Sequence, residues 1–104
     1  MKKRNIHIGD EWQKAQEFAG KLGKPWSAAA LIRVCLSRYM KPTAELLKSE
    51  PEPKRDLKRR AFHIGDEYDK ATKLAKGPGV TPAVLIRETT RRWLQLTYDH
   101  LKGC

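Results

Sequence analysis

The feature that most constrains the fold of this chain is an internal duplication. The hexapeptide HIGDEW at His7–Trp12 returns as HIGDEY at His63–Tyr68, 56 positions later. When residues 3–19 are aligned with residues 59–75, nine of the seventeen positions are identical. Repeats of this kind mark a structural unit that is used more than once. The chain therefore contains two copies of one unit.

A second match shows where the two copies differ in length. SAAALIR at Ser27–Arg33 aligns with TPAVLIR at Thr81–Arg87 at a spacing of 54, so the second copy lacks two residues in a connecting segment. We divide the chain into a first copy at 1–41, a linker at 42–57 and a second copy at 58–104. A unit of about 40 residues is too short to bury a sufficient core alone. We expect the copies to complete one another's core in a single folded unit.

The composition of the chain indicates which cofactors and which cellular location to expect. Cys35 and Cys104 are the only cysteines, and no Cys/His cluster has zinc spacing, so we expect reduced thiols and no metal or other cofactor. The basic start, MKKRN, is not followed by the apolar segment of a signal peptide. No apolar run approaches the roughly 18 residues of a membrane span. The sequence predicts a cytoplasmic protein with no membrane partner.

The charge of the chain is unevenly distributed. The net charge is +10. Residues 1–41 carry nine Lys/Arg against three Asp/Glu, and residues 58–104 carry ten against five. The segment 42–57 carries three against four. Basic repeats joined by a nearly neutral connection indicate a polyanionic partner, most simply nucleic acid.

Each copy begins with a short alternating pattern that is typical of a half-buried strand. One face carries polar or small side chains, namely Lys3, Asn5 and His7 in the first copy and Arg59, Ala61 and His63 in the second. The other face carries Ile6 and Ile8 in the first copy and Phe62 and Ile64 in the second. Arg4 and Arg60 break the apolar side of the pattern, so we expect each strand to begin after them.

Two helices follow in each copy. Asp10 and Asp66 stand where the carboxylate of an N-cap residue is expected, and Ser27 and Thr81 stand at the corresponding position of the second helix. The segment 42–57 contains three prolines and is expected to be a linker with a helical turn or two near residues 43–49.

A strand, a helix, a turn and a helix in about 40 residues, with a basic alternating strand and LIR at 31–33 and 85–87, resembles the ribbon-helix-helix DNA-binding family. In this family, which includes the Arc and MetJ repressors, two chains each give one strand to an antiparallel ribbon that enters the major groove, and four helices form the shared core. The resemblance implies a mainly α fold with a two-stranded antiparallel β-ribbon. The chain resembles such a dimer fused into one polypeptide, a tandem ribbon-helix-helix pseudodimer.

The resemblance implies that the polar strand face reads bases. The implied base-contacting residues are Lys3, Asn5, His7, Arg59, Ala61 and His63. Lys and Arg suit guanine, Asn suits adenine, and Ala61 suits a thymine methyl group. The family usually has polar residues in both strands, whereas this chain has Asn5 in one and Ala61 in the other. We therefore expect two unlike half-sites.

The resemblance also implies contacts to the DNA backbone. In the family, the start of the second helix binds a phosphate, since its free N–H groups and positive helix end attract anions. The implied phosphate-contacting residues are Lys2, Lys24, Ser27, Ala28, Lys58 and Thr81. Pro82 has no N–H group, so the second phosphate site has one donor fewer.

Several side chains admit more than one interpretation. His7 and His63 occupy equal positions and are either a pair of metal ligands, contacts to bases or phosphates, or solvated strand residues. Trp12, Tyr68 and Trp93 have the spacing of core residues, although aromatic side chains also stack on single-stranded bases. Arg33 and Arg87 are expected to pair with carboxylates around the core. The GDE runs suit helix starts better than acid–base catalysis, and we expect no enzyme activity and no small-molecule substrate.

We expect a sequence-specific double-stranded DNA-binding protein of a prokaryotic cell, phage or plasmid, acting as a transcriptional repressor, with self-association on adjacent sites an open question. The alternatives are an accessory protein of a conjugative relaxosome or another architectural DNA protein, an antitoxin-type interaction module, and a single-strand or RNA binder. The chain continues for only a few residues, DHLKGC, beyond the second helix, which disfavours the antitoxin with its usual toxin-binding tail.

Overall fold

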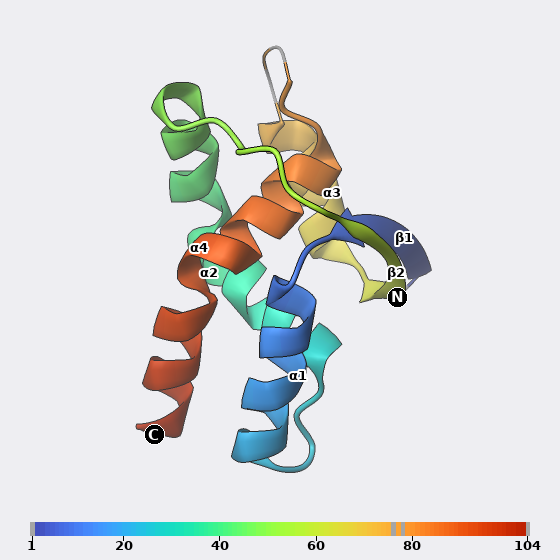
Figure 1. Cartoon of the computed structure of the whole chain (residues 1–104), viewed down its shortest axis with the longest axis vertical. Helices are drawn as coiled ribbons and strands as arrows, with labels where there is room; N and C mark the ends of the chain where they lie inside the picture. Colours follow the sequence, from blue (N-terminus) through green and yellow to red (C-terminus); the bar gives the residue numbers. More distant parts are fainter. Residues whose placement is uncertain (1, 76, 78, 104) are drawn as a thin grey trace.

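The structure is a computed structural model that describes residues 2–75, 77 and 79–103. It is mainly helical and contains β1 (Lys2–Ile8), α1 (Glu11–Leu22), α2 (Ala28–Ser49), β2 (Lys58–Ile64), α3 (Asp66–Leu74) and α4 (Pro82–Lys102). Each half of the chain therefore has the order strand, helix, helix. The two strands lie together at one edge of the molecule, and the segment between α2 and β2 crosses α4 to reach them (Figure 1).

The two strands form an antiparallel ribbon within the chain. Asn5 lies opposite Ala61 at the centre of the ribbon. The expectation that the strands begin after Arg4 and Arg60 is wrong, because they begin at Lys2 and Lys58. The guanidinium of Arg4 lies 4.0 Å from the centre of the Tyr68 ring. A long arginine stem can cover apolar surface while its charged end stays accessible, so this residue type fits the inner side of a strand.

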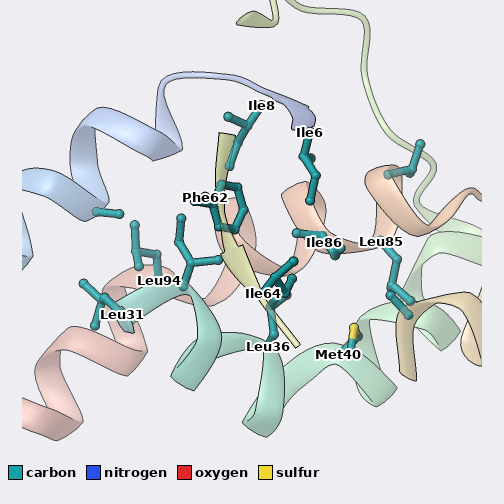
Figure 2. Packing of buried hydrophobic residues seen from close by; sticks show 14 of the residues in the cluster. Ile6, Ile8, Leu31, Leu36, Met40, Phe62, Ile64, Leu85, Ile86 and Leu94 are labelled. Carbon is teal, nitrogen blue, oxygen red and sulfur yellow. The ribbon is translucent and has the colours of Figure 1, made fainter. Parts of the chain in front are cut away.

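The inner face of the ribbon forms one wall of the core. Ile6, Ile8, Phe62 and Ile64 are all 4 % exposed or less. They point toward α2 and α4, where they join Leu31, Leu36, Met40, Leu85, Ile86 and Leu94 (Figure 2). Burial of one such side chain stabilises a fold by about 1.5–3 kcal/mol. The predicted alternation of the strands is confirmed on both faces.

Two of the four predicted N-caps are confirmed. The Ser27 hydroxyl accepts a hydrogen bond from the Ala30 amide, and the Thr81 hydroxyl accepts one from the Val84 amide, both at 3.2 Å. The side-chain caps predicted for Asp10 and Asp66 are wrong. Asp10 has helical backbone angles and makes no capping bond, while α3 begins at Asp66 itself. Both carboxylates still carry negative charge at the positive end of a helix.

Helix α2 is longer than the sequence pattern indicates. It continues through Pro42 to Ser49, so the first half of the predicted linker is helical. The hydroxyl of Thr43 donates to the Tyr39 carbonyl at 2.7 Å and accepts from the Trp93 indole N–H at 2.8 Å. The rings of Tyr39 and Trp93 stack at 4.8 Å. Packing against α4 therefore sustains the helix beyond a residue that usually disrupts one.

Candidate nucleic-acid interface

The outer face of the ribbon carries all six predicted base-contacting side chains. Lys3, Asn5, His7, Arg59, Ala61 and His63 are all exposed. They lie in three cross-strand rows: Lys3 with His63, Asn5 with Ala61, and His7 with Arg59. Each outer row contains a Lys or Arg beside a histidine, and none contains a carboxylate. The face is therefore cationic at both ends and has its amide and methyl groups at the centre.

The register separates the two histidines. His7 lies opposite Arg59 and His63 lies opposite Lys3, so the histidines occupy opposite ends of the ribbon. The idea that they approach one another as metal ligands is wrong, because equal positions in antiparallel strands meet only at the centre. Within the described part of the chain, no group of three or more His, Cys, Asp or Glu is placed to hold a metal ion.

Two arginines support the ribbon from behind. Arg33 of α2 donates to the carbonyl of His63 at 2.8 Å, and Arg87 of α4 donates to the carbonyl of His7 at 3.1 Å. Arg87 also forms a two-pronged ion pair with Glu52, at 2.5 and 2.6 Å. The prediction of a carboxylate partner is confirmed for Arg87. It is wrong for Arg33, whose hydrogen bond is to the backbone.

The start of α2 lies beside the outer face of the ribbon. A hollow of about 500 Å³ is lined by Lys3, Ala61 and His63 from the ribbon and by Trp26, Ser27 and Ala28 from the helix start, among others. Ser27 satisfies the Ala30 amide, whereas the amides of Ala28 and Ala29 precede the first intrahelical bond. Exposed Lys24 lies in the preceding turn. The structure thus brings together base-contacting and phosphate-contacting residues of the prediction.

The other predicted phosphate contacts have different surroundings. At the start of α4, Thr81 caps Val84, and Pro82 occupies the first turn without an N–H group. Lys2 lines a separate hollow of about 300 Å³ with Asp66 and Asp69. Lys58 lines another, of about 270 Å³, with Asp10 and Asp56. Lys2 and Lys58 therefore line hollows with carboxylates and do not line the hollow at the start of α2.

A buried ion network that the sequence pattern does not reveal fixes the segment leading to β2. Arg55 binds both carboxylate oxygens of Glu11, at 2.5 and 2.7 Å, and one oxygen of Glu88 at 3.2 Å. Glu11 and Glu88 are 1 % and 0 % exposed. Arg91 and Arg92 also donate to Glu88. Arg55 lies 44 positions from Glu11 and 33 from Glu88, so no local signal identifies it as their partner, whereas Arg91 and Arg92 lie one helical turn from Glu88.

The contacts within the network shift the pKa values of its members. Burial alone would raise the pKa of Glu88, but hydrogen bonds and positive charge from Arg91 and Arg92 outweigh it and hold the pKa below its usual value. The carboxylates also raise the pKa values of the arginines, chiefly because Arg55 donates hydrogen bonds to Glu11 and Arg91 donates hydrogen bonds to Glu88. Several carboxylates are thus neutralised internally. Among the described residues, Lys3 and Arg59 of the ribbon face form no ion pair with a carboxylate.

The aromatic residues and Cys35 lie in the core or pack against it. Trp12 and Tyr68 pack against the core, and Trp93 stacks on Tyr39, so the prediction that these rings are core residues is confirmed. Cys35 is fully buried, and burial raises the pKa of its thiol to about 11. Cys104 lies outside the described residues.

Comparisons of the chain with protein-family models, with curated proteins and with solved structures gave no match. In the described residues, no helix is both long enough and apolar enough to cross a membrane. The functional assignment therefore depends on the ribbon, the start of α2 and their chemistry.

Proposed function

We propose that the chain is a sequence-specific double-stranded DNA-binding protein that reads the major groove with its β1–β2 ribbon. The observation that carries this proposal is the division of the ribbon into an apolar buried face and an exposed face with Lys3, Asn5 and Arg59. A two-stranded ribbon fits the major groove, where the donors and acceptors of the base edges distinguish all four base pairs. Lysine, arginine and asparagine are the side chains best suited to bases there.

We further propose that the two halves form a tandem ribbon-helix-helix pseudodimer. In a two-fold assembly, equivalent residues near the axis meet one another, and other contacts occur in reciprocal pairs. Tyr39 and Trp93 are repeat equivalents, 54 positions apart, and their rings stack. The hydrogen bonds of Arg33 and Arg87 to the carbonyls of His63 and His7 form a reciprocal pair. These contacts support an internal pseudo-two-fold axis through the ribbon and the crossing of α2 and α4.

The start of α2 supports a phosphate contact that fixes the orientation of the ribbon. Ala28 and Ala29, whose amides precede the first intrahelical bond, line the hollow that Lys3 and His63 also line, and exposed Lys24 lies in the turn before the helix. Such contacts position a protein on the duplex without reading its sequence. A protein bound in this way excludes others from the same site, so we propose that it acts as a transcriptional repressor.

Selection of bound duplexes from a random pool tests the proposal. A common motif should emerge, and its central positions should be non-palindromic because Asn5 lies opposite Ala61. On the selected duplex, Asn5→Ala or Arg59→Ala should cost about 1–3 kcal/mol in binding free energy, with little loss on random DNA. Lys14→Ala, at an exposed position on α1, is the matched control. Equal losses on both duplexes, or tighter binding to single strands, would contradict base readout in the groove.

A further inference from the structure

We propose that the chain has a second binding surface, a groove between α2 and α3 that accepts an acidic, helical segment of a partner protein with one aromatic anchor. The α2–α3 groove comprises Arg38, Lys41 and Ala44 on α2 and Lys70, Lys73 and Leu74 on α3. It consists of two adjoining hollows of about 380 and 210 Å³ that share Lys41, Lys73 and Leu74. None of its lining residues belongs to the ribbon or to the start of α2.

The duplication provides an internal comparison for this groove. By repeat position, Leu74 corresponds to Phe18, 56 residues earlier, and Ala44 corresponds to Tyr98, 54 residues later. In the other half, between α1 and α4, the rings of Phe18 and Tyr98 stack at 4.3 Å with an angle of 11° between their planes. The α2–α3 groove has a leucine and an alanine at the same two positions. It therefore lacks both rings that fill its counterpart.

The filled counterpart indicates what kind of side chain would occupy the groove. The Lys102 ammonium lies 5.4 Å from the centre of the Tyr98 ring. Lys48 is the repeat equivalent of Lys102, and it lines the smaller hollow beside Ala44. An aromatic side chain from a partner would thus meet Leu74 where Tyr98 meets the Phe18 ring, together with a lysine at the repeat position of Lys102.

The rim of the groove defines the charge of its partner. Arg38, Lys41, Lys70 and Lys73 are all exposed. Among the described residues, none of these four has an ion-pair or hydrogen-bond partner. Lys73 replaces Glu17 of the first copy, so the groove has exchanged a carboxylate for a cation relative to its counterpart. The rim also carries Glu45, which is paired with Lys48 at 3.3 Å, so its charge is compensated within the chain. The four unpaired cations around an apolar floor complement a segment that carries several carboxylates and one large apolar side chain.

The apolar floor favours a peptide over a second DNA duplex. Phosphates would satisfy the lysines but leave the half-buried side chains of Ala44 and Leu74 without an apolar partner. An amphipathic helix laid into a groove satisfies both requirements, since its anchors fill the floor while its polar residues meet the rim. The surface would allow a DNA-bound molecule to recruit or respond to another protein, and this inference goes beyond the proposed DNA binding.

Binding of designed peptides tests the inference. The probe is a Glu- and Ala-rich helical peptide of about 16 residues with a central Phe, because shorter isolated helices are marginal in water. It should bind the full chain in a fluorescence anisotropy titration. A version with Ala in place of the Phe should bind about tenfold more weakly or worse, since it buries no anchor. A peptide with Lys in place of every Glu should not bind.

Variants locate the binding site of the probe. Ala44→Tyr should fill the groove from within, as Tyr98 fills its counterpart, and should weaken binding about tenfold or more. The Lys41→Glu/Lys73→Glu variant changes only exposed side chains and should weaken it similarly. Lys14→Glu/Lys21→Glu, with the same change in net charge on α1, should change the affinity by less than about twofold, since screening weakens distant charges. All variants should retain duplex binding, so failure of this inference and failure of the DNA-binding proposal are distinguishable.

Three results would overturn the inference. One is failure of the Phe-containing probe to bind, and another is equal binding to the wild-type chain and to both groove variants. The third is a different occupant. Loss of duplex binding in the Lys41→Glu/Lys73→Glu variant would assign the groove to nucleic acid. Self-association of the wild-type chain that Ala44→Tyr abolishes in sedimentation would assign it to a second copy.

Discussion

Replacement of Arg55 by methionine should destabilise the fold strongly, although Arg55 lies in an extended segment between two regular elements. The guanidinium provides both hydrogen bonds to the carboxylate of Glu11, which is 1 % exposed, and one to Glu88. Removal of one partner from a buried ion pair costs about 3–5 kcal/mol, because the other charge stays buried without compensation. Glu88 retains Arg91 and Arg92, and removal of the guanidinium admits water to Glu11. We therefore expect the free energy of unfolding to fall by about 3 kcal/mol, the lower end of this range.

The double variant separates the ion pair from the packing around it. Arg55→Met/Glu11→Met replaces the pair by apolar side chains, an exchange that is often nearly neutral. Its free energy of unfolding should therefore lie within about 1 kcal/mol of the wild-type value, far from the sum of the single losses. Lys54→Met, a substitution of the exposed neighbour of Arg55, should leave the stability within about 0.5 kcal/mol.

Urea unfolding followed by tryptophan fluorescence measures these differences. The loss of about 3 kcal/mol should also lower the melting temperature by roughly 12 °C or more for a domain of this size. A loss below about 1 kcal/mol for Arg55→Met, or a double variant whose loss equals the sum of the single losses, would refute the reasoning. Either result would mean that Glu11 is well solvated without its arginine.

Three further predictions concern the interface and the network. Ala61→Asn places an amide opposite Asn5 and should shift the centre of the selected duplex toward a palindrome. A repeated selection from the random pool would reveal this shift, and an unchanged centre would mean that Asn5 and residue 61 do not read bases. Lys24→Ala should weaken binding to all duplexes and reduce the slope of log affinity against log salt by about 0.9, measured by titration at several salt concentrations; an unaltered slope would exclude a phosphate contact. The lowered pKa of Glu88 means that its ionised form stabilises the fold above the ordinary glutamate pKa, and that this contribution is lost as the pH falls through the lowered pKa. Glu88→Gln should therefore be less stable at neutral pH and lose less stability on acidification, in urea unfolding curves recorded across the acid range; parallel pH profiles of the two proteins would contradict the assignment.

Local signals in the sequence are sufficient for the two strands and for the starts of two helices. The alternation in residues 3–8 and 59–64 depends only on which face of a strand is buried, and it identifies the outer face. Ser27 and Thr81 form caps because a hydroxyl three residues before an amide needs no help from the rest of the fold. The same local argument fails at Asp10, whose side chain lies 3.9 Å from Arg55. An ion from a distant segment competes there with the helix start.

Features that depend on contacts between distant segments could not be predicted. The continuation of α2 past Pro42 depends on a hydrogen bond between Thr43 and Trp93, which are 50 residues apart. The network of Arg55 joins the segment before β2 to α1 and α4. For the candidate site, the sequence pattern identified the six side chains of the outer face, while their cross-strand rows required the register of the ribbon.

Fusion of two repeats into one chain, on the proposed arrangement, permits an asymmetry that a homodimer cannot have. In a dimer of identical chains, every substitution appears twice, on both sides of the axis. Here the second copy has Ala61 opposite Asn5 at the centre of the ribbon, and Pro82 where α2 begins with free amides. The first copy has Ala44 where the second has Tyr98. These differences lie at the proposed base-reading face, at the proposed phosphate site and at the α2–α3 groove. On this proposal, the protein would bind an asymmetric duplex in one orientation and present the groove on one side of it.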